Sequence, residues 1–292
     1  MPASTQQRLE LGKRDHALLQ TLASVRFLRF EHIHDIFYPG TAHQWPSERL
    51  GKLTRFGFLQ KLAMPVLLTD NESNLSRSNV FTLGEAGQTF AQSQLGFPES
   101  VVSWNANPES PATYFKLTHD LETVGFLAAL IVASRRSGKF TVESWRSQFD
   151  MEHATVTLPE DYQKRTPIPD LLVTLKVGTR TEHFCYERDR SSMNNGKMLA
   201  KAKRYVQARN LNIYKSLFGV RNFRVLIHTT SAKRATNIMR LYQEEYDGKY
   251  ARMFWFTPVA DGDGTSGALT PEQVEDYVWM NNGDTKRHSI VE

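Results

Sequence analysis

The sequence lacks the features that would cross-link the chain, bind a structural zinc ion or anchor the protein in a membrane. Its 292 residues include one cysteine, Cys185, which excludes an internal disulfide framework and a cysteine-rich zinc site. The longest apolar run, Phe126–Ala133, is far shorter than the ~20 residues of a membrane-spanning helix. Residues Met1–Lys13 are polar and lack the apolar region of a signal peptide. We therefore expect a cytoplasmic protein with no membrane partner.

The composition is that of a folded protein with an uneven distribution of charge. Hydrophobic residues make up 40% of the chain and charged residues 23%, and the length suits two domains. The net charge is only +5, but residues 170–255 carry seventeen Lys and Arg against seven Asp and Glu. Eleven of these cations lie in Gly196–Arg240, which contains no acidic residue. This basic block predicts a polyanionic partner, most simply double-stranded DNA, and the alternative is a solvated basic face.

Residues 1–97 are predicted to form a domain of helices and one hairpin. Leucines at helical spacing, such as Leu18, Leu19 and Leu22, mark the first helix. The predicted helices cover residues 14–24, 31–37, 45–56 and 84–94, and the predicted strands cover 58–68 and 79–83. A polar loop, 69–78, joins the two strands. This order predicts a winged helix-turn-helix, a fold whose third helix can enter the major groove of DNA.

The third helix, residues 45–56, is the predicted recognition helix. Leu50, Leu53 and Phe56 form its apolar stripe, and Gly57 suits its C-terminal cap. Polar and basic residues on its other face, with one residue on the wing, are the candidates for contacts with phosphates or base edges: Ser47, Arg49, Lys52, Arg55 and Arg77. The alternative is a winged helix that contacts another protein.

Residues 98–113 are predicted to be a linker, because Pro98, Pro108 and Pro111 punctuate them. A long helix is predicted over residues 114–135, and its later part is almost entirely apolar, which predicts burial. A strand is predicted over residues 139–145 and a loop over 155–166.

The segment that follows predicts a β-hairpin with two carboxylates side by side. Two strand-like runs flank Gly178-Thr179, which suits a type II′ turn. In that register Asp170 lies opposite Glu187, and Asp189, two residues further on, shares the face of Glu187. Such carboxylates can bind Mg²⁺, or they can form ion pairs with the nearby Arg188 and Arg190. A register shift of one residue would separate the pair.

The remaining pattern alternates helices and strands. A helix is predicted over residues 197–209, with Lys197, Lys201 and Arg204 on its outer face as candidates for phosphate contacts. Further strands are predicted over residues 222–229 and 252–256, with a helix from Ser231 to about residue 246 between them. Residues 258–292 are predicted to form an acidic loop and a last helix, which opens with a capping box at Thr270 and reaches Met280.

The order of elements in residues 114–257 resembles the restriction-endonuclease-like core. Pro169-Asp170 and Glu187-Arg188-Asp189 are similar to the PD-(D/E)xK motif of that superfamily, but Asp189 stands where the motif has lysine. The resemblance implies Asp170, Glu187 and Asp189 as candidate catalytic residues, with Asp170 and Glu187 as metal ligands. It also implies that a lysine from the next helix, Lys197, Lys201 or Lys203, could replace the missing one. Glu122 is a further candidate acid on the preceding helix.

The chain as a whole, over about residues 14–257, resembles the replication-relaxation family of plasmids and other mobile elements. The resemblance is carried in order by Leu53-Thr54-Arg55-Phe56-Gly57-Phe58-Leu59, Val80–Gly87, His119-Asp120-Leu121, Ile168-Pro169-Asp170-Leu171, Tyr186-Glu187-Arg188-Asp189-Arg190 and Lys203-Arg204-Tyr205. The family carries an E-x-D-R signature here, so Asp189 fits the family pattern. The resemblance implies a DNA-binding protein of plasmid replication, copy number or mobilisation.

These observations predict an α+β and α/β protein with an N-terminal winged helix-turn-helix and a restriction-endonuclease-like mixed-sheet domain. The function predicted first is sequence-specific DNA binding by a homodimer, in the control of replication, copy number, mobilisation or transcription, with no required cofactor and a nuclease-like domain that is not catalytic. One alternative is a Mg²⁺-dependent endonuclease that uses Asp170 and Glu187. A second alternative is an adaptor that recruits a relaxase or replication initiator.

Overall fold

The chain folds into two compact units. The computed structural model describes residues 9–63, 79–102, 111–158, 161–246, 248–258, 269–283 and 285–292. The first unit is Met1–Leu121 and the second is Glu122–Glu292. The division falls within one long helix, α6 (Pro111–Ser137). The predicted linker therefore ends in helix, and it also contains the short helix α5 (Glu99–Val102), whose two valines are buried in the first unit.

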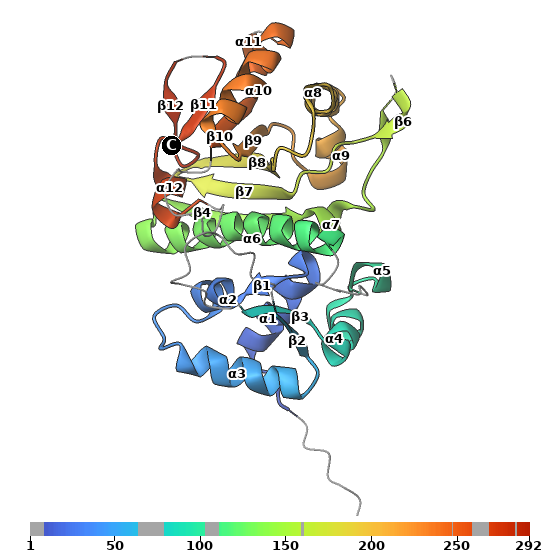
Figure 1. Ribbon diagram of the computed structural model, residues 1–292, viewed down its shortest axis with the longest axis vertical. Helices are drawn as coiled ribbons and strands as arrows, with labels where there is room; N and C mark the ends of the chain where they lie inside the picture. Colours follow the sequence, from blue (N-terminus) through green and yellow to red (C-terminus); the bar gives the residue numbers. More distant parts are fainter. Residues whose placement is uncertain are drawn as a thin grey trace, which may run out of the picture. The chain divides into compact units, whose positions relative to one another are not determined.

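The first unit contains four longer helices and a small antiparallel sheet (Figure 1). Its elements are α1 (Lys13–Val25), β1 (Leu28–Arg29), α2 (Phe30–Phe37), α3 (Gln44–Arg55), β2 (Leu59–Ala63), β3 (Asn79–Leu83) and α4 (Glu85–Leu95). The strand order is β1-β3-β2. The sequence predicted every one of these elements except β1; residues 64–68 of the strand predicted over 58–68 lie outside the described residues. The predicted wing loop, 69–78, lies outside the described residues.

Apolar side chains at helical spacing form the core of this unit. Leu18, Leu19 and Leu22 of α1 and Leu50 and Leu53 of α3 are almost completely buried, as the spacing predicted. The face of α3 opposite its leucines remains exposed to solvent.

The second unit is built around a seven-stranded mixed sheet. Its main elements are β4 (Phe140–Ser147), α7 (Gln148–Met151), β7 (Leu171–Val177), β8 (Arg180–Arg188), α8 (Asn195–Asn210), α9 (Ile213–Phe218), β9 (Arg224–Thr229), α10 (Ala232–Glu245), α11 (Gly248–Ala251) and β10 (Phe254–Pro258). The strand order is β12-β11-β10-β9-β8-β7-β4. The pairs β8–β9 and β9–β10 are parallel, and the other pairs are antiparallel.

Helices cover both faces of this sheet, and each face has its own apolar core (Figure 1). Helix α6 packs Phe126 and Leu130 against Val173 and Tyr186 on one face. Helices α8 and α10 pack on the other face, against a layer that includes Cys185. Because successive strand residues point to opposite faces, Tyr186 and Arg188 face α6, whereas Cys185 and Glu187 face α8.

The predicted hairpin register is confirmed. Leu172 pairs with Cys185, and Thr174 pairs with His183. Gly178 has a φ of 56°, a conformation that glycine adopts readily and that a type II′ turn requires at its first central position. The register places Asp170 and Glu187 at the open end of the hairpin, as predicted.

Two predictions about the second unit were wrong. Residues 155–166 were predicted as a loop, but they contain two short strands, β5 (Thr157–Leu158) and β6 (Asp161–Arg165), which pair with each other. The last helix was predicted to reach Met280, but α12 (Pro271–Glu275) ends earlier. The residues after it form β11 (Trp279–Asn281) and β12 (Arg287–His288), which extend the main sheet beyond β10. Trp279 is fully buried against that sheet, and this burial favours strand over helix.

Among the described residues, one helical stretch, Lys116–Ser137 of α6, is long and apolar enough to cross a membrane. Within the folded chain, 67% of its most apolar window is buried. The helix contributes Phe126, Leu127 and Leu130 to the core beneath the sheet. Burial within the protein therefore accounts for its apolar character.

Candidate functional site

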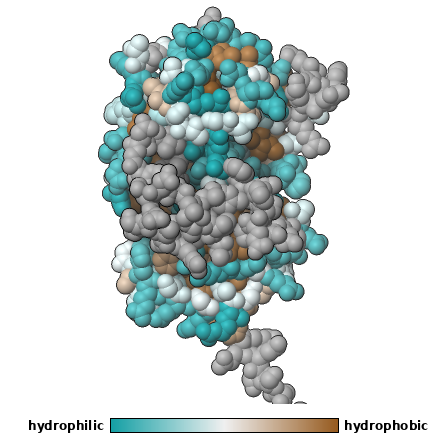
Figure 2. Space-filling model, in the orientation of Figure 1, coloured by the Kyte–Doolittle hydropathy of each residue, from teal (hydrophilic) through white to brown (hydrophobic). Residues whose placement is uncertain are grey.

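Helix α3 presents a polar, partly basic face to solvent. Ser47, Lys52 and Arg55 are exposed, on the side away from Leu50 and Leu53. Figure 2 shows mostly hydrophilic and intermediate colours over this helix. Three of the predicted DNA-contacting side chains therefore lie on one accessible face. Arg77, the fourth of the predicted cations in this unit, lies outside the described residues.

Arg49 was predicted to point outward, but its side chain points toward Asp15. Its Nε donates to Asp15 Oδ1 at 2.9 Å and its Nη2 approaches Asp15 Oδ2 at 2.5 Å. The same Nη2 donates to the carbonyl of Glu10 at 2.8 Å. Asp15 is buried in α1 and its Oδ2 also accepts from the backbone N–H of Gly12 at 2.7 Å. The guanidinium thus connects α3 to the start of α1, and the paired carboxylate raises the pKa of Arg49.

The second predicted site lies where β8 ends, on the face covered by α8. Asp170 Oδ2 accepts a hydrogen bond from the backbone N–H of Arg188 at 2.7 Å. Glu187 Oε2 pairs with Lys201 Nζ at 2.5 Å, and Glu187 Oε1 accepts from the hydroxyl of Tyr205. Lys201 therefore points inward, where an outward direction was predicted. Of the three lysines proposed as replacements, Lys201 is the one that reaches Glu187.

The charges at this site depend on each other. Burial raises the pKa of Glu187, and the neighbouring Asp170 carboxylate raises it further, whereas Lys201 opposes both effects. The negative charges of Glu187 and Asp170 raise the pKa of Lys201 against the effect of its own burial. Burial also strongly raises the pKa of Tyr205 beside Glu187, so the phenol remains a hydrogen-bond donor. The pair is consequently a buried ion pair supported by a neutral donor.

Asp189 does not join the other two carboxylates. Arg234 Nε donates to its Oδ2 at 2.8 Å, and the backbone N–H of Ser191 donates to its Oδ1 at 3.0 Å. Arg234 Nη2 also donates to the carbonyl of Met193 at 2.8 Å. The Asp189 carboxylate is thus engaged by groups other than those that contact Asp170 and Glu187. Within the part of the chain that the structure describes, no group of three or more His, Cys, Asp or Glu side chains could hold a metal ion.

A separate polar cluster lies on the α6 face of the same strand end. Glu122 Oε2 lies 3.0 Å from Arg188 Nε and 3.6 Å from Arg190 Nε. Arg188 Nη1 donates to the carbonyl oxygens of Asp189 and His228 at 3.0 Å each. The predicted partner of the acid pair, Arg188, therefore uses its backbone for Asp170 and its side chain for Glu122.

Sequence reasoning missed three residues of this region: Tyr205, Arg234 and His228. Tyr205 follows Lys201 by four residues, so helical spacing could have placed both over Glu187. Arg234 and His228 come from distant elements, α10 and β9, and no local spacing reveals them.

Ion pairs neutralise part of the basic block. Four of its eleven cations contact carboxylates: Lys201 with Glu187, Lys203 with Glu245, Arg224 with Glu182 and Arg234 with Asp189. For the other seven, the described residues provide no ion pair; they are Lys197, Arg204, Arg209, Lys215, Arg221, Lys233 and Arg240. Lys197 is exposed at the start of α8, and Arg204 is partly exposed further along the same helix.

The chain matches a known protein family. The family model described as Replication-relaxation covers residues 19–220, which is more than half of the chain. The chain belongs to the replication-relaxation family. The match begins within α1, covers the rest of the first unit and continues through the hairpin and α8 of the second unit.

Membership in this family indicates a role in the replication or relaxation of a plasmid or other mobile element. Neither the curated proteins nor the solved structures gave a match to the chain. The function proposed below therefore rests on the family and on the geometry of the two units.

Proposed function

We propose that this member of the replication-relaxation family is a sequence-specific DNA-binding protein of a plasmid or mobile element. It binds through its first unit, and its second unit is not catalytic. The observation that carries the proposal is the exposed face of α3, which presents Ser47, Lys52 and Arg55 together. An accessible helix with basic and hydroxyl side chains matches what the major groove requires.

The arrangement of the first unit supports a winged helix-turn-helix. Helices α1, α2 and α3 are followed by the antiparallel pair β2–β3, and β1 adds a third short strand. In such a fold the helix before the hairpin reads the DNA and the hairpin lies beside it. The pair between Asp15 and Arg49 fixes α3 to α1, so that Lys52 and Arg55 are presented from a rigid helix.

The order of α6, β4, β7, β8, α8 and β9 supports a restriction-endonuclease-like second unit. Its carboxylates, however, are already engaged by protein groups. Both oxygens of Glu187 have partners, and Asp189 pairs with Arg234. Two carboxylates with these partners do not fit a Mg²⁺ site, because the ion prefers octahedral oxygen ligands that are free to bind it. We therefore assign this unit a structural role, as a basic clamp or dimerisation unit in a homodimer.

A metal-dependent endonuclease is the second candidate, and one observation favours it. Lys201 brings a cation to Glu187, and this is the charge that the motif lacks when Asp189 takes the lysine position. The adaptor that recruits a relaxase or replication initiator is a third candidate, without an observation that favours it over the first.

Footprinting on the DNA that flanks the protein's own gene tests the first candidate. We expect a protected site, and we expect Lys52→Ala plus Arg55→Ala to weaken binding to it by ~1–3 kcal/mol for each side chain that contacts a base. The control variant, Arg180→Ala plus Arg287→Ala, removes two exposed charges from the second unit. No protected site, or equal binding by both variants, would contradict the proposal, and the first of these results would favour the adaptor.

Incubation with supercoiled plasmid and Mg²⁺ or Mn²⁺ tests the endonuclease. We expect no nicking, and we expect Asp170→Asn to lower the melting temperature because the Arg188 N–H then loses a charged acceptor. If the wild type nicks the plasmid and Asp170→Asn or Glu187→Gln abolishes the nicking, the second unit is catalytic and the first proposal is wrong on this point.

A further inference from the structure

A cationic pocket lies at the end of the main sheet opposite the Glu187 site. Its volume is about 500 Å³, and it is lined where β8, β9 and β10 begin and where α8 ends. Those three strands are parallel, so their first residues lie together at one end of the strands. Glu187 lies near the opposite end, beside the last residue of β8. The pocket is thus separate from the carboxylates described above.

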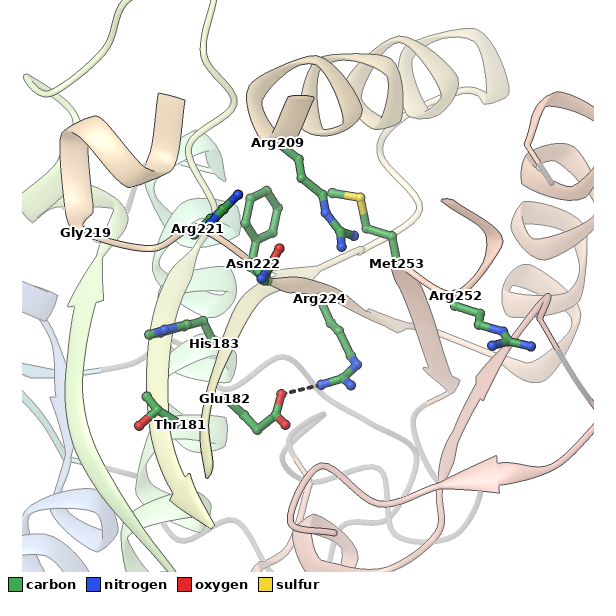
Figure 3. Close-up of a pocket in the computed structure, with 11 residues that line it drawn as sticks. Thr181, Glu182, His183, Arg209, Gly219, Arg221, Asn222, Arg224, Arg252 and Met253 are labelled. Atoms are coloured by element: carbon green, nitrogen blue, oxygen red, sulfur yellow. Dashed lines mark hydrogen bonds and ion pairs between the residues drawn. The ribbon is translucent and has the colours of Figure 1, made fainter. Parts of the chain in front are cut away.

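The lining of this pocket is unbalanced in charge. Four arginines contribute to it, Arg209, Arg221, Arg224 and Arg252, and Glu182 is the single carboxylate among the lining residues. Glu182 Oε2 is 2.6 Å from Arg224 Nη1, and the Arg224 guanidinium also lies 4.9 Å from the ring centre of Trp255. Figure 3 shows this pair, with Arg209 extending from the end of α8 and with Arg221 and Arg252 on either side.

Three of the four arginines have no counter-charge among the residues that the structure describes. They are Arg209, Arg221 and Arg252, and Glu182, the one carboxylate among the described lining residues, is already paired with Arg224. Burial lowers the pKa of His183, which also lines the pocket, so its ring is neutral near pH 7 and adds a polar group without charge. Like charges gathered around one hollow repel each other unless an anion lies between them.

We propose that this pocket binds a small molecule that carries a pyrophosphoryl group, either as free pyrophosphate or as part of a nucleoside di- or triphosphate. Guanidinium groups bind phosphate oxygens through two parallel hydrogen bonds, and three unpaired arginines match a group with two to four negative charges. A volume of about 500 Å³ lies in the range of small-molecule sites. Pyrophosphoryl binding at this pocket is independent of DNA binding by α3.

Isothermal titration calorimetry of the full chain with pyrophosphate, ATP and adenosine, at about 0.1 M salt, tests the proposal. We expect pyrophosphate and ATP to bind and adenosine not to bind. We expect Arg209→Gln plus Arg221→Gln to weaken both affinities at least ~10-fold, because two guanidinium groups that bind phosphate are removed. Arg180→Gln plus Arg287→Gln, which removes the same charge from exposed positions outside the pocket, should retain the wild-type affinities.

The three ligands distinguish free pyrophosphate from a nucleotide as the source of the pyrophosphoryl group. The variants distinguish this proposal from the DNA-binding proposal. ATP binding about tenfold tighter than pyrophosphate would identify a nucleotide site, and equal binding would identify a site for the phosphate groups alone. Lys52→Ala plus Arg55→Ala should leave ATP binding unchanged. Absence of binding by both phosphate ligands, or equal loss in the pocket and control variants, would overturn the proposal. So would pocket variants that bind ATP normally and lose affinity only for DNA.

Discussion

Buried charges at the end of β8 are each held by a different protein partner. Asp170 accepts from a backbone N–H, Glu187 from Lys201 and Tyr205, and Asp189 from Arg234. A buried carboxylate without such a partner would destabilise the fold by several kcal/mol. The arrangement therefore explains how one strand end tolerates alternating acidic and basic residues. Each of these acids is thus engaged by protein groups and not by the same one.

His228 provides a test of stability at the scale of one side chain. It is fully buried in β9, its Nδ1 lies 2.9 Å from the hydroxyl of Tyr186, and the positive charge of Arg188 is close by. Burial first, and then Arg188, lower the pKa of His228 to about 3. In the unfolded chain the same ring takes up a proton near pH 6.5. Stability is therefore fully present above pH 6.5 and is lost as the pH falls toward 3.

We predict that the wild type loses about 2 kcal/mol of unfolding free energy between pH 7 and pH 5 through this histidine alone. The measurement is urea denaturation at both values of pH, for the wild type and for His228→Asn. The variant should be less stable at pH 7, because the contact with Tyr186 changes, but its loss between pH 7 and pH 5 should be smaller by about that amount. His153→Asn is the control, because it replaces an exposed histidine. An identical pH dependence of wild type and His228→Asn would contradict the prediction.

Helix α4 requires two glycines at its start, Gly84 and Gly87, because this part of the helix packs closely on the backbone of another segment. The backbone N–H of Gly84 donates to the carbonyl of Phe58 at 3.0 Å, and that of Ala86 donates to Gly57 at 3.1 Å. A Cβ atom at Gly84 would lie 2.3 Å from the Gly57 carbonyl oxygen, and one at Gly87 would lie 2.1 Å from that of Phe58. The helix therefore packs directly on the turn that ends α3, with no room for a side chain between them.

We predict that Gly87→Ala lowers the unfolding free energy by about 1–3 kcal/mol, because helix and turn must move apart. Gly51→Ala is the matched control. Gly51 is also helical, but a Cβ there meets no atom within 4 Å, so the substitution should raise stability by about 0.5–1 kcal/mol. Thermal and urea denaturation of both variants measure the difference. Equal effects of the two substitutions on the unfolding free energy would show that close packing does not explain the glycine at position 87.

The elements that the sequence predicted well are those whose signals are local. Apolar spacing located α1, α3 and α8, and the turn at Gly178 fixed the hairpin register that brings Asp170 and Glu187 together. The elements that it predicted poorly depend on distant partners. Strand β11 forms because it pairs with β10 and because its Trp279 is buried. So short a segment shows no periodicity from which this pairing could be predicted.

The same distinction holds for the candidate site. The spacing of charged residues placed Lys201 and Arg49 on the outer faces of their helices, as helical periodicity suggests. Each instead points toward a buried carboxylate, because Glu187 and Asp15 lie where the helices pack. Long side chains can turn in this way, so the direction of Lys or Arg follows from the nearest buried acid and not from helical phase alone.

At the scale of the whole molecule, the net charge of the basic block overstates what it can offer to DNA. Four of its eleven cations are neutralised by carboxylates, and two of the others, Arg209 and Arg221, line the cationic pocket of the second unit. Among the candidates on α8, Lys197 and Arg204 have no ion pair in the described chain, whereas Lys201 does. For the DNA binding proposed above, the cations that could release counterions are therefore fewer than the eleven in the sequence.

The salt dependence of DNA affinity separates these two kinds of cation. Each phosphate-binding charge that a substitution removes should reduce the slope of log affinity against log salt by roughly 0.9. We predict that Lys197→Ala plus Arg204→Ala reduces the slope by about twice that amount, because both cations are available to the backbone of DNA.

The matched variant, Glu187→Gln plus Lys201→Met, removes the buried pair together, so that no charge is left unpaired in the core. It should leave the slope unchanged and alter only the melting temperature. A slope that falls equally in both variants would mean that Lys201 leaves Glu187 to contact DNA, and an unaltered slope in both would mean that this face of α8 is solvated and takes no part in binding.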